Sequence, residues 1–104
     1  MKPYKEVQVE NLTESDDKVS LSGILVSTAG SSFVMDDGTG QVIVLSDEEQ
    51  VSRLKTNSFL RVMGMKLLSQ ENTVNAEIIQ DLLGIDKYLY NKVRKAILNG
   101  KKEG

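Results

Sequence analysis

The run Asp36-Asp37-Gly38-Thr39-Gly40 has the residue types of a loop that binds phosphate or calcium. Glycine-rich phosphate loops lead directly into a helix, because the helix N-terminus supplies part of the field that holds the anion. Here the run leads into the apolar stretch 41–45, and its spacing does not fit an EF-hand. Asp-Gly between two apolar stretches instead predicts a tight hairpin turn.

Two residue types that are central to enzyme and metal chemistry are missing. The 104 residues include no histidine and no cysteine. This excludes Ser-His-Asp triads, cysteine nucleophiles, disulfides and zinc sites of the usual kind. We therefore expect no enzymatic activity, no metal site and no cofactor, and the composition favours a binding module.

The charge is small and unevenly distributed. The formal net charge is −2 and the pI is about 5.1, whereas domains that bind nucleic acid tightly on their own are usually basic. Up to Asp86 there are seven basic and fourteen acidic residues, and from Lys87 onwards there are six basic residues and one acidic residue. The cations of this final segment either complement the C-terminal end of a helix or form a short basic arm for nucleic acid.

Most of the chain is predicted to form short strands. Apolar stretches with partial period-2 alternation, separated by turn residues, predict strands at 19–26, 33–35, 41–45, 59–68 and 73–79. Ser46 and Glu49 have the spacing of a capping box, which predicts a short helix over 46–55. Gly23 and Gly64 lie inside strands, as expected where a small barrel bends sharply.

Three strands, a short helix, two strands and a final helix are the order of a five-stranded OB-fold barrel, an all-β fold with added helices. An SH3-like small barrel is the main alternative. We expect one domain over 1–104. Its expected parts are an N-terminal arm (1–17), the barrel (18–83), a C-terminal helix (85–99) and a basic tail (100–104).

The chain resembles the OB-fold family of single-stranded DNA-binding proteins in the stretches VSLSGILV (19–26), FVMDDGTGQVIV (33–44), FLRVMG (59–64) and VNAEII (74–79). The resemblance is to the middle subunit of replication protein A and its archaeal and telomeric relatives, and it covers roughly 18–100. It implies a non-catalytic, intracellular subunit of a complex for replication or repair, in the cytoplasm, nucleus or nucleoid. The positions where that family stacks aromatic side chains on bases fall here at Ser46 or Asp47 and at Ser69. Each such contact is worth about 1–3 kcal/mol, so we expect weak binding.

The candidate nucleic-acid contacts follow from strand alternation. Phe33 and Met35, like Val42 and Val44 on the next strand, are predicted to face the interior. Val34 and Ile43 then point outwards, on the surface where OB folds bind their ligands. They could pack on bases, on the arm Met1–Val9, or on a partner protein.

On the strand 59–68, Leu60 and Val62 are predicted to face inwards. Phe59, Arg61 and Met63 then face outwards. Arg61 and Lys66 are the candidate phosphate contacts, although two cations on an acidic domain also fit ordinary surface charge. The candidate nucleic-acid-binding residues are Val34, Ile43, Arg61 and Lys66.

The segment Ile85–Leu98 is predicted to be a helix with an unusually wide apolar face. Its apolar side chains span an arc of about 200°, against the roughly 100° that one core-facing stripe needs. The surplus predicts helix packing against a second chain, and deeper packing on the barrel is the alternative. The resemblance implies the same, since in that family the terminal helix joins subunits in a helical bundle. The candidate partner contacts are Tyr88, Leu89, Val93, Ala96 and Ile97.

Two functions fit these features. The first is a subunit of a single-stranded DNA-binding complex that binds DNA weakly, or only within the complex, and assembles with a partner subunit or with itself through the terminal helix. The second is an OB-fold scaffold that binds only protein. No apolar run approaches 18 residues and no signal peptide is visible, so we expect no membrane partner and an intracellular location.

Overall fold

The computed structural model describes residues 4–13, 17–67 and 72–82. The predicted terminal helix, its five candidate partner contacts and the basic tail lie outside the described residues. The same holds for Ser69.

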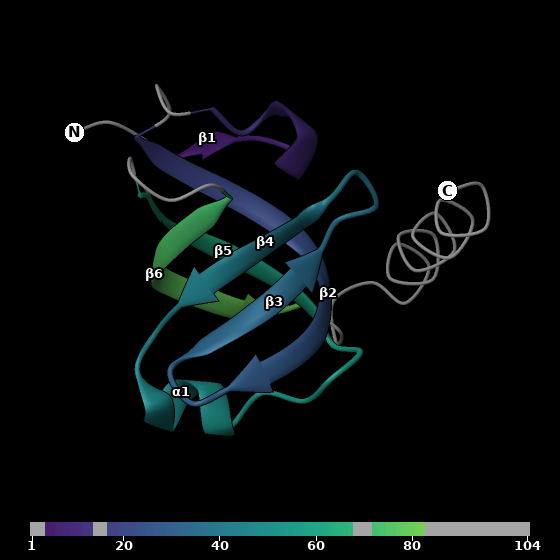
Figure 1. The fold of residues 1–104 in the computed structure, drawn as a ribbon, viewed down its shortest axis with the longest axis vertical. Coiled ribbons are helices and arrows are strands. Elements are labelled where there is room, and N and C mark those ends of the chain that lie inside the picture. The colour runs from purple at the N-terminus through teal and green to yellow at the C-terminus, as the bar shows by residue number, and fades with distance from the viewer. Residues whose placement is uncertain (1–3, 14–16, 68–71, 83–104) are drawn as a thin grey trace.

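The described residues form a mainly β structure with one short α-helix, which confirms that part of the expected fold (Figure 1). A 3₁₀ helix spans Val9–Asn11, and α1 spans Glu48–Ser52 between the fourth and fifth strands. The strands are β1 (Lys5–Glu6), β2 (Lys18–Ala29), β3 (Ser32–Asp36), β4 (Gln41–Leu45), β5 (Phe59–Lys66) and β6 (Thr73–Asp81).

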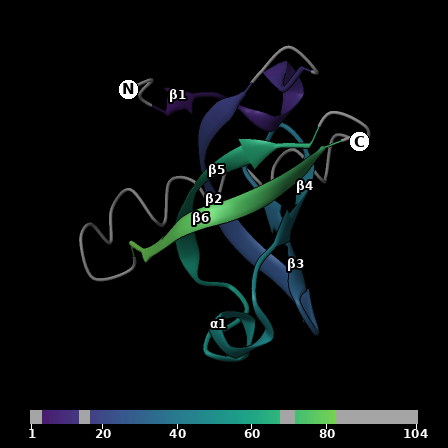
Figure 2. The same ribbon diagram turned by 90° about the vertical axis from the view of Figure 1, so that its left-hand side faces the viewer.

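All six strands belong to one sheet, in the order β1-β2-β3-β4-β6-β5, and β2 also pairs with β5. The pairings of β2 to β6 therefore form a closed ring. The long strand β2 makes this possible because residues 18–24 pair with β5 and residues 24–29 pair with β3. Figure 2 shows β6 crossing in front of β2, and β6 also pairs with β4 through residues 73–75.

Close approaches of the backbone explain the two glycines inside strands. A Cβ at Gly64 would overlap the backbone of Asn75, and the register between β5 and β6 shifts between Met63 and Gly64. A Cβ at Gly23 would lie 2.6 Å from the carbonyl oxygen of Asp36. The expected irregularity is therefore present at Gly64. Gly23 instead allows the close approach of the Asp36 backbone, and the register shift of β2 comes later, between residues 25 and 27.

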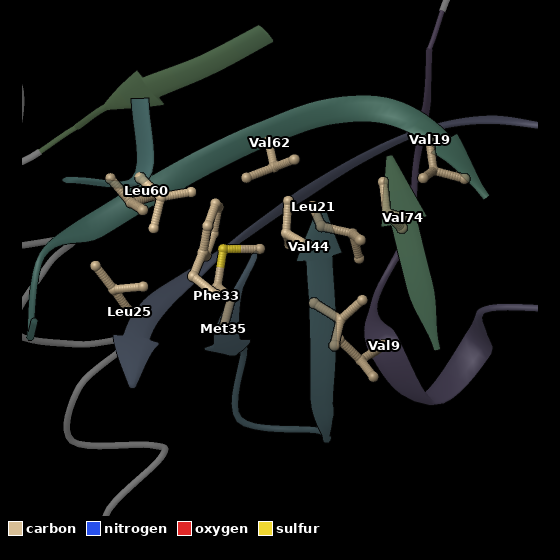
Figure 3. Close-up of a cluster of buried hydrophobic side chains, with 12 residues drawn as sticks. Val9, Val19, Leu21, Leu25, Phe33, Met35, Val44, Leu60, Val62 and Val74 are labelled. Carbon is tan, nitrogen blue, oxygen red and sulfur yellow. The ribbon is translucent and has the colours of Figure 1, made fainter. Parts of the chain in front are cut away.

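The core fills the inside of the closed sheet (Figure 3). Phe33, Met35, Val42 and Val44 are each at most 1% exposed, which confirms the predicted inward face of β3 and β4. Burial of this many large aliphatic side chains is the main stabilising contribution, at about 1.5–3 kcal/mol for each. Val9 of the N-terminal arm joins this core and is 2% exposed.

A second apolar cluster lies apart from the main core. It consists of Ile24, Phe59 and Leu82. We expected Phe59 to be an outward-facing residue of its strand, but its side chain is 3% exposed. Alternation alone could not reveal this, because the burial comes from neighbouring Ile24 across the β2–β5 pair and from Leu82, whose N–H donates to the carbonyl of Phe59 at 2.8 Å.

The N-cap of α1 lies one residue later than predicted, and the helix is shorter than the predicted range 46–55. Asp47 is the N-cap, and its carboxylate accepts a hydrogen bond from the backbone N–H of Gln50 at 2.7 Å. The Ser46 hydroxyl instead lies 2.8 Å from the side-chain oxygen of Gln50. Serine and aspartate are both good N-caps, so two adjacent candidates left the sequence pattern ambiguous.

Replacing Asp47 with alanine should lower the free energy of unfolding by about 1 kcal/mol, because the N–H of Gln50 loses its acceptor at the start of the helix. Urea denaturation of the purified chain measures this loss. Ser46→Ala is the matched control and should cost clearly less. A larger cost for Ser46→Ala than for Asp47→Ala would contradict the assignment of the cap.

Candidate functional site

Two of the four candidate nucleic-acid contacts lie directly opposite each other. Val34 of β3 pairs with Ile43 of β4, and on its other side Val34 pairs with Ser27 of β2. Ile43 is 45% exposed and Val34 is half-buried. The register thus places an apolar pair on the outer surface where β3 and β4 run side by side (Figure 1).

Arg61 is not part of this surface. It lies on β5, where its neighbours across the sheet are Ser22 of β2 and Gln80 of β6. The neighbours of Val34 are Ser27 and Ile43 instead. The structure therefore separates the candidate cation from the apolar pair that it was expected to support.

Lys66 is not presented as a surface cation. The residue is 6% exposed, and its ammonium group donates a hydrogen bond to the carbonyl of Leu67 at 2.6 Å. The reason is strand alternation. Leu60 and Val62 face the interior, so residue 66 lies on the same face. An inward lysine of this kind lies at the end of the core. Its ammonium group donates to a backbone carbonyl oxygen and does not contact a phosphate.

The turn between β3 and β4 holds the N-terminal arm. The Asp37 carboxylate accepts a hydrogen bond from the backbone N–H of Val9 at 2.8 Å, and the Thr39 hydroxyl accepts one from the N–H of Glu10 at 3.1 Å. The residue that precedes the 3₁₀ helix, Gln8, makes no side-chain cap of its own. The Asp-Gly turn is therefore more than a hairpin connection, because it caps a helix formed by a distant segment.

A second set of contacts fixes the start of the arm. β1 runs parallel to β2, with Lys5 opposite Val19. The Tyr4 hydroxyl donates to a Glu77 carboxylate oxygen at 2.6 Å, and the Lys18 ammonium lies 5.4 Å from the centre of the Tyr4 ring. The hydrogen bond to Glu77 raises the pKa of Tyr4, with smaller contributions from desolvation and from the charge of Glu77. The described part of the arm thus packs on β2, the turn and the core, and it leaves Ile43 exposed.

The arm and the sheet line an open hollow of about 550 Å³. Sequence reasoning missed it, because most of its wall comes from the arm, whose path carries no periodic signal. Its lining residues are Lys5, Glu6, Val7, Gln8, Asn11, Ser22, Asp37 and Phe59.

Two kinds of feature are missing from the part of the chain that the structure describes. No three of its His, Cys, Asp and Glu residues gather as ligands for a metal ion. None of its helices is both long and apolar enough to cross a membrane.

Solved structures of similar shape cover nearly the whole chain. In the S. pombe Stn1–Ten1 complex, one chain matches with a TM-score of 0.66 and 19% identity, over 97% of this chain and 94% of that one. U. maydis replication protein A bound to single-stranded DNA matches with a TM-score of 0.68 and 19% identity, over 90% of this chain and 89% of that one. The chain has the OB fold.

A third OB-fold structure shows a different kind of ligand. The OBody AM3L09, solved bound to hen egg-white lysozyme, matches with a TM-score of 0.59 and 13% identity, over 78% of this chain and 97% of that one. No protein-family model matches the sequence, and no curated protein matches it. The expected resemblance to replication protein A and its telomeric relatives is confirmed by structural similarity.

Replacing Asp37 with alanine should detach the arm locally. The N–H of Val9 would lose a charged acceptor in a part-buried position, and such a loss costs about 1–3 kcal/mol of the free energy of unfolding. Hydrogen exchange at the Val9 amide measures the local effect, and urea denaturation measures the global one. Asp37→Asn keeps an acceptor oxygen and should show a smaller change. Unaltered Val9 exchange in Asp37→Ala would contradict the cap.

Proposed function

We propose that this chain is a non-catalytic, intracellular OB-fold subunit of a single-stranded DNA-binding complex that acts in replication or repair. The observation that carries the proposal is the outward-facing apolar pair of half-buried Val34 and exposed Ile43 on β3 and β4. Its support is the match over almost the full chain to subunits from the Stn1–Ten1 complex and from replication protein A with single-stranded DNA.

DNA binding by the isolated chain is weak in this proposal. The chain carries a net charge of −2. Arg61 lies away from Val34 and Ile43, and Lys66 is buried. Few phosphates are neutralised as a result, and cation contacts with phosphates supply most of the non-specific affinity for nucleic acids. The functional affinity then depends on further subunits.

Titration of fluorescent oligo-dT with the isolated chain should give a dissociation constant of about 1 µM or weaker at physiological salt, as expected for sparse phosphate contacts. Ile43→Ser should weaken binding further. Ile78→Ser is the matched control, because Ile78 is 42% exposed but lies on β6, opposite Met63 of β5. Nanomolar affinity of the lone chain, or equal losses in the two variants, would show that the binding surface lies elsewhere.

Assembly forms the second part of the proposal. The segment Ile85–Leu98 binds a partner subunit or a second copy of the chain through Tyr88, Leu89, Val93, Ala96 and Ile97. The wide apolar arc in the sequence supports this, since exposed apolar surface of that extent promotes association.

Truncation after Gly84 should abolish association while it leaves every described strand in place. Sedimentation equilibrium compares the full chain with the truncated one. The double variant Leu89→Glu and Val93→Glu should act in the same way, because two charges would be buried in the helix interface. A full-length chain that stays a monomer of 11.5 kDa at high concentration would contradict self-association.

A protein-only scaffold is the alternative function. Two observations favour it: the acidic body of the chain and the similarity to an OB-fold protein that was solved bound to lysozyme. The oligo-dT titration separates the two functions, since a scaffold of this kind shows no saturable binding.

A further inference from the structure

A gap in the pairing of β2 lies beside the N-terminal arm. β1 pairs with β2 at Val19 and Ser20, and β3 pairs with β2 from Ile24 onwards. Residues 21–23, between these two pairings, pair with β5 on one edge and with no strand of the described residues on the other. The open hollow between the arm and the sheet lies at this gap, because Ser22 is part of its lining.

The backbone N–H and C=O of Ser22 face this gap. Both groups of a strand residue point to the same edge, and successive residues alternate between the two edges. The N–H of Leu25 donates to the carbonyl of Ser58 at 2.9 Å, so Leu25 faces the β5 side. The carbonyl of Ser20 accepts from the N–H of Val7 at 3.1 Å, so Ser20 and, two residues on, Ser22 face the arm. Neither backbone group of Ser22 has a hydrogen-bond partner among the described residues.

The gap exists because the arm turns away from β2 before it can fill it. A longer β1 would bring the carbonyl of Val7 to the N–H of Ser22. Instead the chain enters its 3₁₀ helix at Val9, whose N–H donates to the Asp37 carboxylate. Ser22 is half-buried, and backbone polar groups that are withdrawn from water need a partner. The hollow therefore offers one backbone donor and one backbone acceptor to a ligand.

The other lining residues favour an uncharged ligand that both donates and accepts hydrogen bonds. Gln8 and Asn11 contribute side-chain amides that have no hydrogen-bond partner among the described residues. The charged lining residues are one cation, Lys5, and two carboxylates, Glu6 and Asp37, so no single sign of charge dominates. The Asp37 carboxylate already accepts three hydrogen bonds from the arm and the turn, which leaves it poorly suited to a cation.

We propose that the hollow binds a small, uncharged, planar lactam, a ring that carries an N–H beside a C=O. The C=O of the ligand accepts from the N–H of Ser22, and the N–H of the ligand donates to the C=O of Ser22. Val7 and Phe59 supply apolar surface for the ring, and the amides of Gln8 and Asn11 supply further polar contacts. The volume of about 550 Å³ is typical of small-molecule sites, which span about 300–1,000 Å³. A site of this kind goes beyond the proposed function and does not depend on it.

A matched pair of ligands tests the hydrogen bonds. 2-Pyridone has the lactam edge, and N-methyl-2-pyridone has the same ring with its donor blocked. Titration of the full-length chain, followed by NMR amide shifts, should give saturable shifts at Ser22 and Val7 with 2-pyridone. The methylated ring should bind about ten-fold more weakly or worse, because the C=O of Ser22 loses its donor. Equal binding of the two rings, or an unshifted Ser22 amide, would overturn the inference.

Hydrogen exchange tests the gap itself. Leu21 and Gly23 face β5, where they lie opposite Val62 and Leu60. The Ser22 amide should therefore exchange faster than both of its neighbours in the free chain. Saturating 2-pyridone should slow exchange at Ser22. Equal protection of residues 21–23 in the free chain would contradict the site, since the N–H of Ser22 would then already have a partner.

A double variant tests the contribution of the arm. Gln8→Ala with Asn11→Ala removes both side-chain amides of the hollow and should weaken 2-pyridone binding several-fold. Asn75→Ala with Gln80→Ala is the matched control, because it makes the same changes at exposed residues of β6 outside the hollow. Equal effects of the two double variants would show that the arm does not form part of the site.

Thymidine separates this site from the proposed DNA-binding surface. Its base carries an N–H beside a C=O, so the free nucleoside should shift the Ser22 amide, whereas oligo-dT should shift the amide of Ile43. A shift of Ser22 with oligo-dT but not with thymidine would overturn the inference, because the hollow would then belong to the surface that binds DNA. If oligo-dT shifts no amide, the proposed function fails, and a thymidine shift at Ser22 still supports the lactam site.

Discussion

The double pairing of β2 is the constraint on which the rest of the structure depends. Its first half pairs with β5 and its second half with β3, so one strand closes the sheet. That closure requires the backbone of β2 to approach Asp36 at Gly23, where a side chain would not fit. It also forces the outward residues of β2, β3 and β4 into common rows. The outward-facing surface of these strands is thus a product of the same geometry that buries Phe33 and Met35.

The N-terminal arm adds a short strand to the closed sheet and a side chain to its core. β1 adds two residues parallel to the start of β2, and Val9 joins the core. The Asp37 carboxylate and the Thr39 hydroxyl hold the arm through its backbone N–H groups. Because the described part of the arm packs on the turn and on β2, it leaves Ile43 exposed on the outer surface of β4.

Local patterns predicted most of the sheet and the outward placement of two of the four candidate residues. Period-2 alternation was sufficient for Val34 and Ile43, since both lie in short strands without irregularity. The same alternation, followed along β5 from Leu60, places Lys66 inside, so a cationic side chain was a misleading signal there. The hydrogen bond that the N–H of Val9 donates to Asp37 joins residues 28 positions apart. No local sequence pattern encodes a contact of that kind.

The cap that the β3–β4 turn supplies to the distant 3₁₀ helix also orders the events of folding. The arm precedes this turn in the chain, and its 3₁₀ helix has no cap until Asp37 and Thr39 have formed the turn. A helix of three residues cannot persist alone, because nucleation costs more than one hydrogen bond returns. The 3₁₀ helix therefore forms only once the β3–β4 hairpin exists, and the arm docks as a late step. During synthesis, the helix of the arm therefore depends on residues that are translated after it.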